Sequence, residues 1–237
     1  MMESVPFHFK NFSITQQGVA HALGTDGVLL GAWADTRGRK RVLDIGTGTG
    51  IVALMLAQRE PEALVTGIDI HPPSVRCART NFEASPWAGR LEAREISLQE
   101  LASAEQAQYD LIVSNPPFFS EATRSPDPER SLGRHTATLS PAELAASVSA
   151  LLSPDGHFCL ILPVKEGRIF GEAAVFDRLY CNREVSVRTY PDKQAERLLM
   201  TFSKDPGYYR REYLTLFDST GGKTPEFRQM TSEFYLY

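Results

Sequence analysis

Short apolar runs alternate with helical patterns along most of this chain of 237 residues. The apolar runs are rich in aliphatic and β-branched residues and are bounded by Gly, Pro, Asn or Asp, as strands usually are. We predict strands at 42–45, 63–70, 91–96, 109–114, 158–162, 183–189, 197–202 and 213–217. We predict helices at 51–57, 72–82, 140–152, 166–179 and 225–234. This alternation predicts an α/β fold with a doubly wound, mostly parallel sheet.

The two ends of the chain are less regular. Aromatic and polar residues alternate from Phe7 to Phe12, which predicts a short strand near the N-terminus. Thr25 or Asp26 is placed to cap the apolar helix that follows. The alternation of strands and helices ends in a hairpin-like pair of strands. Because the pattern contains no repeat, linker or low-complexity segment, we predict a single domain over residues 1–237, with residues 1–39 as an N-terminal segment.

Composition excludes several classes of protein. Hydrophobic residues make up 42% and charged residues 23% of the chain, as in ordinary globular proteins. No apolar run approaches the ~20 residues that span a bilayer, and no signal peptide is visible. Three widely separated cysteines are typical of reduced thiols in a cytoplasmic protein rather than of a disulfide framework or a zinc site. We therefore expect a cytoplasmic protein with no metal and no membrane partner.

Charge leaves nucleic-acid binding open. The net charge of −4 argues weakly against a protein covered by nucleic acid. Basic residues nevertheless gather at 37–41 and again between 183 and 211. Phosphate contact depends on such local potential rather than on the total charge. Each cluster is equally compatible with an ordinary solvated surface.

A glycine-rich turn follows the first strong strand. Its sequence, Asp44-Ile45-Gly46-Thr47-Gly48-Thr49-Gly50, is neither the dinucleotide nor the nucleoside-triphosphate pattern. Glycine permits positive φ and the close approach of a ligand to the backbone. Asp69 ends the next apolar run, 19 residues beyond Gly50, about where an acid binds ribose hydroxyls in nucleoside-binding α/β folds. Together these features resemble the S-adenosylmethionine (SAM) site of class I methyltransferases.

That resemblance implies a Rossmann-like methyltransferase sheet of seven strands with an antiparallel C-terminal strand. It also implies that Asp69 binds the ribose and that Ile70 packs on the adenine of SAM. Asp44 would order the glycine turn and reach the methionine ammonium through water. Ser97 is placed either to contact the adenine amine or to serve as an ordinary polar residue at a strand end.

A second motif, Asn115-Pro116-Pro117-Phe118, follows a confident strand. Two consecutive prolines make a rigid turn that continues neither a helix nor a strand. The motif resembles the catalytic turn of methyltransferases that act on planar nitrogen atoms. The Asn115 side-chain oxygen and the Pro116 carbonyl would accept from the substrate amine, so that its lone pair turns toward the methyl group of SAM. Phe118 would stack on the substrate ring.

Four further segments are similar to bacterial tRNA (adenine-N6)-methyltransferases that modify the adenine beside the anticodon of a valine tRNA. They are Phe9–Ile14, Gly24–Trp33, Asn115–Phe119 and Arg130–Leu139. The resemblance spans essentially the whole chain. It departs at Ala22, where the family usually has lysine, which puts in doubt any role for a basic residue there.

The family resemblance implies N6-methylation of an adenine in tRNA with SAM as the cofactor. We expect a monomer, although the sequence leaves the oligomeric state open. Gly24, Thr25 and Asp26 would cover the methionine moiety of the cofactor, and Arg134 and His135 would contact the substrate. The full set of expected cofactor-binding residues is Gly24, Thr25, Asp26, Asp44, Gly46, Thr47, Gly48, Gly50, Asp69, Ile70, Ser97, Leu98 and Asn115.

Three alternatives remain at this point. One is methylation of guanine N2 in ribosomal RNA, and another is methylation of a glutamine amide in a protein. The glutamine enzymes usually carry a separate N-terminal helical domain, whereas only about 40 residues precede the glycine turn here. The third is a non-catalytic RNA-binding protein with the SAM fold, against which the presence of Asp69 and Asn115 counts.

Overall fold

The structure of the protein is a computed structural model. It describes residues 6–17, 19, 23–104, 108–116 and 139–236. Its strands are β1 Phe7–His8, β2 Ser13–Ile14, β3 Arg41–Ile45, β4 Leu64–Asp69, β5 Leu91–Glu95, β6 Tyr109–Ser114, β7 Leu152–Pro163, β8 Tyr180–Arg188, β9 Arg197–Ser203 and β10 Arg210–Thr215. Its helices are α1 Thr25–Trp33, α2 Ile51–Arg59, α3 Pro72–Glu83, α4 Leu98–Ala104, α6 Pro141–Leu151, α7 Val164–Ala174 and α8 Pro225–Thr231. Short 3₁₀ turns, η1 Ala88–Arg90 and η3 Val175–Asp177, complete the set.

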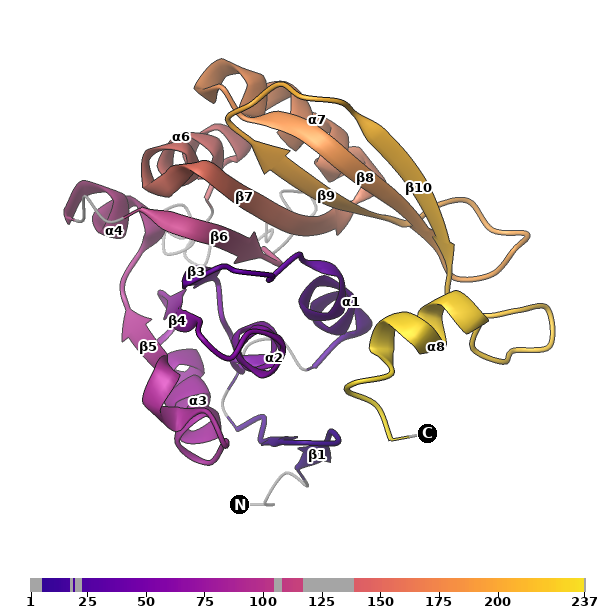
Figure 1. Cartoon of the computed structure of the whole chain (residues 1–237), viewed down its shortest axis with the longest axis horizontal. Coiled ribbons are helices and arrows are strands. Elements are labelled where there is room, and N and C mark those ends of the chain that lie inside the picture. Colours follow the sequence, from indigo (N-terminus) through magenta and orange to yellow (C-terminus); the bar gives the residue numbers. More distant parts are fainter. Residues whose placement is uncertain (1–5, 18, 20–22, 105–107, 117–138, 237) are drawn as a thin grey trace, which may run out of the picture.

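The main sheet confirms the predicted fold class. Its strand order is β10-β8-β9-β7-β6-β3-β4-β5 (Figure 1). Every neighbouring pair is parallel except those made by β9, which is antiparallel to both β7 and β8. Strands and helices alternate along the chain, so the sheet is doubly wound as expected.

Two details of the sheet correct the expectation. The sheet has eight strands rather than seven, and its antiparallel strand is β9, whereas the C-terminal strand β10 is parallel to β8. The β8–β9 hairpin reverses the chain and returns it to the edge at which β8 began. The chain then crosses to the free side of β8 and must run in the direction of β8 when it forms β10. The place of an edge strand depends on which strand of the sheet still has unpaired backbone groups. The pattern of residues within one strand does not indicate that.

Alternating side chains place a hydrophobic core on each face of the sheet. Val42, Leu111 and Cys159 belong to the cluster that α1, α2, α3 and α8 cover. Their sequence neighbours Leu43 and Ile112 belong to the cluster under α4, α6 and α7. Successive residues of a strand point to opposite faces, so these buried strands are apolar on both sides. Cys159 is buried in the first of these clusters.

Helix starts follow local chemistry, with one correction. Ser140 and Glu143 form the reciprocal capping box predicted for α6. At α1, however, Gly24 is the N-cap residue and makes no side-chain cap bond, so the predicted cap at Thr25 or Asp26 is wrong. Asp26 lies in the first turn of that helix, where an acidic side chain is favoured by the helix dipole.

The N-terminal hairpin and the C-terminal tail pack together. Phe9 stacks on Phe12 and on Tyr235, with ring centroids 4.7 Å and 5.9 Å apart. The backbone N–H of Lys10 donates to the carbonyl of Phe234, whose side chain is buried. The aromatic tail therefore packs on its own chain. Among the described helices, none is long and apolar enough to cross a membrane.

Candidate active site

The expected site residues follow strands that end at one edge of the sheet. Ile45 at the end of β3 pairs with Ser114 at the end of β6 and with Ile68 near the end of β4. All three strands are parallel, so the glycine turn, Asp69 and Asn115 meet at the carboxyl edge. Ligands of open α/β sheets bind at this edge.

The glycine turn has a backbone that other residues would strain. Gly46, Gly48 and Gly50 have φ values of 70°, 56° and 82°. The N–H groups of Gly46 and Thr47 both donate to the carbonyl of Ile68, at 2.9 Å each, which ties the turn to β4. A Cβ at Gly46 would meet no atom within 4 Å, whereas one at Gly50 would lie 2.4 Å from the Phe82 ring. The chain thus leaves space beside Gly46 and packs tightly at Gly50.

Asp44 contacts this turn through a hydrogen bond with Thr47. Asp44 is 2% exposed, and its carboxylate accepts a 2.7 Å hydrogen bond from the Thr47 hydroxyl. Burial raises the pKa of Asp44 to about 7, although the Thr47 hydrogen bond opposes that rise. Gly67 on β4 makes room for this arrangement, because a Cβ there would lie 2.6 Å from the Thr47 hydroxyl oxygen. The expectation that Asp44 orders the turn therefore has a direct structural basis.

Asp69 lies beside the turn with its carboxylate fixed by two backbone groups. Oδ2 accepts from the N–H of Gly48 at 3.0 Å, and Oδ1 accepts from the N–H of His71 at 2.9 Å. Each carboxylate oxygen keeps a lone pair for another donor. The neighbouring Ile70 side chain is 51% exposed, which leaves an apolar surface next to this acid. An acid and an exposed apolar residue together suit a nucleoside.

Ser97 caps helix α4, which the sequence analysis did not predict. Its hydroxyl donates to the Glu100 carboxylate at 2.7 Å and accepts from the Glu100 N–H at 3.2 Å. This hydrogen bonding lowers the pKa of Glu100. The S-x-x-E spacing was a readable capping signal. Ser97 Oγ keeps one lone pair, and the buried Leu98 begins the helix.

Asn115 and Pro116 continue directly from β6. The Ser114 hydroxyl donates to the carbonyl of Ile45 at 3.0 Å and so joins the ends of β6 and β3. Asn115 is partly exposed and Pro116 is buried. Four other expected residues, Pro117, Phe118, Arg134 and His135, lie outside the described residues.

A buried asparagine that the sequence analysis missed joins the N-terminal segment to the glycine turn. Asn81 on α3 accepts from both the N–H and the hydroxyl of Thr15, at 2.9 Å each. Its amide donates to the carbonyl of Thr15 at 3.0 Å and to that of Thr49 at 2.8 Å. One side chain therefore fixes two segments at the site. No motif announces such a role, because it depends on contacts between distant parts of the chain.

The start of α1 lies at the same edge. Asp26 Oδ2 accepts from Arg197 Nε at 2.8 Å, and Arg197 begins β9 opposite Pro163 at the end of β7. Nearby, Gln16 Oε1 accepts from the N–H of Leu23 at 2.7 Å. A Cβ at Gly24 would meet no atom within 4 Å. The three residues expected over the cofactor, Gly24, Thr25 and Asp26, are thus placed at the carboxyl edge.

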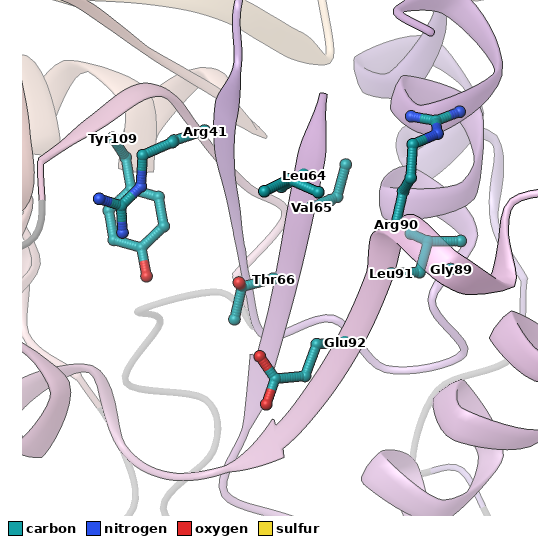
Figure 2. Close-up of a pocket in the computed structure, with 9 residues that line it drawn as sticks. All are labelled: Arg41, Leu64, Val65, Thr66, Gly89, Arg90, Leu91, Glu92 and Tyr109. Atoms are coloured by element: carbon teal, nitrogen blue, oxygen red, sulfur yellow. The ribbon is translucent and has the colours of Figure 1, made fainter. Parts of the chain in front are cut away.

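The opposite edge has a different character. A groove of about 310 Å³ lies where β3, β4 and β5 begin, lined in part by Arg41, Leu64 and Leu91 (Figure 2). Thr66 and Glu92 lie side by side on β4 and β5 in this view, and the Arg41 guanidinium lies 5.4 Å from the centre of the Tyr109 ring. None of the expected site residues lines this groove. Among the described residues, no group of three or more His, Cys, Asp or Glu side chains could hold a metal ion.

Comparison with known proteins shows the family to which the chain belongs. Residues 23–138 match the family model of the methyltransferase small domain, a span that includes both motifs. The chain is 39% identical over 231 residues to the tRNA1(Val) (adenine(37)-N6)-methyltransferase of Yersinia pestis strain Pestoides F, covering 97% of this chain and 93% of that protein. The same enzyme of Yersinia pseudotuberculosis strain YPIII is also 39% identical, with 97% and 92% covered.

Solved structures agree on the fold. A protein from Agrobacterium tumefaciens, described as a predicted O-methyltransferase, superposes with a TM-score of 0.70 at 20% identity, covering 90% of this chain and 98% of that one. A ribosomal protein L11 methylase from Lactobacillus delbrueckii superposes with a TM-score of 0.55 at 18% identity, covering 79% and 82%. At these identities the likeness concerns the fold alone.

Proposed function

We propose how this site works from one premise: the chain belongs to the family of tRNA1(Val) (adenine(37)-N6)-methyltransferases. The resemblance seen in the sequence is thereby confirmed. The reaction is the SAM-dependent methylation of the exocyclic N6 amine of an adenine in tRNA, and we assign it to the purine beside the anticodon of a valine tRNA. The observation that carries the assignment of residues is the meeting of the glycine turn, Asp69 and Asn115 at one edge of three adjacent strands.

The carboxyl edge fits SAM in three respects. The open space beside Gly46 admits a ligand where a Cβ would intrude, the fixed carboxylate of Asp69 suits ribose hydroxyls, and exposed Ile70 suits an adenine ring. When bound, SAM supplies an electrophilic methyl group. The remaining lone pair of Ser97 Oγ can accept from the adenine amine. The backbone N–H of Leu98, in the first turn of α4, has no partner within that helix.

The methionine end of the cofactor would lie between the glycine turn and the start of α1. Asp44 is hydrogen-bonded to Thr47 of that turn, and an anionic carboxylate there would attract the methionine ammonium through water. Gly24, Thr25 and Asp26 would cover the same end from α1. The ion pair of Asp26 with Arg197 makes Asp26 a positioning residue for this helix start.

Asn115 and Pro116 would orient the substrate amine. The N6 nitrogen of adenine is a poor nucleophile because its lone pair is delocalised into the ring. Hydrogen bonds from its two N–H groups to the Asn115 side-chain oxygen and the Pro116 carbonyl favour a pyramidal nitrogen whose lone pair is free. Such orientation contributes several kcal/mol to lowering a barrier. The proton is lost after methyl transfer, so no strong base is required.

The remaining assignments rest on the family alone. We propose that Phe118 stacks on the adenine and that Arg134 and His135 contact the RNA. We also propose that the enzyme acts as a monomer in the cytoplasm, where tRNA is used.

The function is tested with methyl-labelled SAM and separate samples of unmodified valine tRNA transcript, ribosomal RNA, DNA and release factor. Digestion of the labelled product to nucleosides or peptides identifies the methylated atom. We expect N6-methyladenosine from the tRNA. Label only in guanine N2 or in a glutamine side chain would replace the substrate with one of the alternatives, and SAM binding without any transfer would support the non-catalytic role.

A further inference from the structure

The edge strand of the sheet, β10, carries a row of three residues that includes an exposed arginine and an exposed tyrosine. Residues 211, 213 and 215 of β10 share one face, because side chains alternate along a strand. The Tyr213 residue is 72% exposed, and the Arg211 side chain is 47% exposed. Their side chains touch, with the Arg211 guanidinium carbon 5.6 Å from the centre of the Tyr213 ring. An exposed aromatic ring beside an exposed guanidinium offers a ligand both a stacking surface and a positive charge.

A buried acid holds Arg211 of this row and a second arginine, Arg168 of α7, in place. Glu184 on β8, with its side chain 1% exposed, forms ion pairs with Arg168 of α7 and with Arg211. Arg168 Nη2 donates to Glu184 Oε1 at 2.8 Å, and Arg211 Nε lies 3.2 Å from the same oxygen. Two guanidinium groups thus share one carboxylate, which leaves a net positive charge. Each guanidinium has five N–H donors, so donors remain for a ligand.

The row extends along β10 toward the carboxyl edge of the sheet, where the expected site residues lie. Across the β10–β8 pair, Arg211 is opposite Glu184, Tyr213 is opposite Ser186 and Thr215 is opposite Arg188. Arg188 Nε donates to the Thr215 hydroxyl at 2.8 Å. These two residues are the last of β8 and β10, so the row ends at the carboxyl ends of both strands. From Arg211 to Thr215 the strand extends about 13 Å. In Figure 1 the end of β10 and the β8–β9 hairpin lie on the same side of the sheet as the ends of β6 and β7.

We propose that this arginine–tyrosine face, formed by Arg168, Arg188, Arg211 and Tyr213, binds the sugar–phosphate backbone of the substrate tRNA outside the methylated nucleotide. The proposal rests on the proposed function. Three strand spacings separate β8 from β6, so Arg188 lies on the order of 14 Å from the Asn115 turn across the sheet. A free nucleotide bound at Asn115 cannot cover that span, whereas a folded RNA can.

The chemistry of the face favours RNA over other partners. Arginine donates paired hydrogen bonds to phosphate, and tyrosine and guanidinium planes stack on unpaired bases. The whole chain has a net charge of −4, so a cationic row on it directs a polyanion to one place. Holding the guanidinium groups on Glu184 before binding also reduces the entropy lost when RNA binds.

The opposite face of β10 offers a matched control. Arg210 is adjacent to Arg211, but it points the other way and pairs with Glu212 at 3.0 Å, with its side chain 75% exposed. The two residues have the same charge and the same strand. They differ in the face that they occupy and in the acid that each pairs with, which is partly exposed Glu212 for Arg210 and buried Glu184 for Arg211.

The test compares R211A, Y213A and R210A in the full chain, with dissociation constants for valine tRNA transcript measured by filter binding at several salt concentrations. We expect R211A and Y213A each to weaken binding on the order of tenfold, and R211A to reduce the salt slope by about one. R210A should bind as the wild type does. All three should keep wild-type SAM affinity, and R210A and Y213A should keep wild-type thermal unfolding. R211A removes one of the two partners of buried Glu184 and should unfold at a lower temperature, so Y213A, at an exposed position, tests the face without that change in stability.

Unchanged tRNA affinity in R211A and Y213A, or an equal loss in R210A, would overturn the proposed face. If the wild type methylates adenine in tRNA while these variants bind tRNA normally, only this inference fails. If the wild type neither binds nor methylates tRNA, the proposed function fails, and this inference fails with it.

Discussion

The backbone N–H of Gly48 donates a 3.0 Å hydrogen bond to Asp69 Oδ2, which couples the glycine turn of β3 to the acid at the end of β4. The two residues are 21 positions apart. This bond, with a second one from the N–H of His71, fixes the carboxylate beside the glycine turn. It also makes Asp69 both a candidate ligand of ribose and a support of the turn.

Replacing Asp69 separates these two roles. We expect D69A to weaken SAM binding at least tenfold in calorimetry, because hydrogen bonds to a charged group contribute about 1.5–3 kcal/mol each. D69N keeps one acceptor oxygen, so it can accept from Gly48 but no longer from His71. It should be less destabilised than D69A, yet it should bind SAM less tightly than the wild type because the charge is lost. Wild-type cofactor affinity in both variants would contradict the assignment to ribose.

Two glycines of the same turn should respond differently to alanine. In G46A the positive φ costs roughly 1–2 kcal/mol, but nothing obstructs the methyl group, so the fold persists while SAM binding is blocked. In G50A the methyl group also collides with the Phe82 ring, which adds roughly 1–3 kcal/mol of overpacking. Urea unfolding and SAM calorimetry on both variants test this. Equal destabilisation of the two would show that the space beside Gly46 is not open.

Asp44 should make stability depend on pH. Its folded pKa of about 7 lies above the ordinary 3.8, because burial disfavours the charged form. The folded state therefore keeps a proton that the unfolded state releases between these values. The resulting contribution is full below about pH 4, falls as pH rises, and is absent above about pH 7.

The matched variant for this effect is D44N, which cannot ionise but can still accept from Thr47. We expect the stability of the wild type relative to D44N, from urea unfolding between pH 5 and 8, to fall as pH rises. The slope is at most about 1.4 kcal/mol per pH unit for a single proton. A difference that stays constant over this range would place the pKa of Asp44 outside it.

Asn115 should matter for turnover and little for the cofactor. N115A loses the side-chain oxygen that would accept from the adenine amine, so we expect methyl transfer to tRNA to fall at least a hundredfold while SAM affinity stays within about twofold. N115D keeps an acceptor oxygen at the same position and should retain measurable activity. Single-turnover assays with labelled SAM measure both. Near-wild-type rates in N115A would exclude the proposed role.

The ion pair of Asp26 and Arg197 should act through the position of α1. Because the pair is partly exposed, its loss should change the free energy of unfolding by only about 0.2–1 kcal/mol. We expect D26A and R197A to weaken SAM binding by similar factors and the double variant to be no worse than either. If D26A alone has the larger effect, Asp26 contacts the cofactor directly instead of only positioning the helix.

Local signals account for what the sequence predicted well. The Asp44–Gly50 turn, the alternation of strands and helices and the capping box at Ser140 all depend on residues near one another in the chain, and the structure contains each of them. The capping box at Ser97 was equally local and was overlooked. Residues 153–156 lie between the predicted helix at 140–152 and the predicted strand at 158–162. In the structure they belong to the long strand β7, where the pairing skips from Leu152 to His157.

The sequence by itself thus determined the fold class, the family and the residues that follow each strand, because periodicity and turn chemistry are properties of short segments. Tertiary structure alone decided the place of β10 at the sheet edge, the bridge from Asn81 to Thr15 and the pair of Asp26 with Arg197, 171 residues away. It also gathered Arg168, Glu184 and Arg211 from three elements. Such contacts arise only when packing brings distant segments together, so no local pattern encodes them.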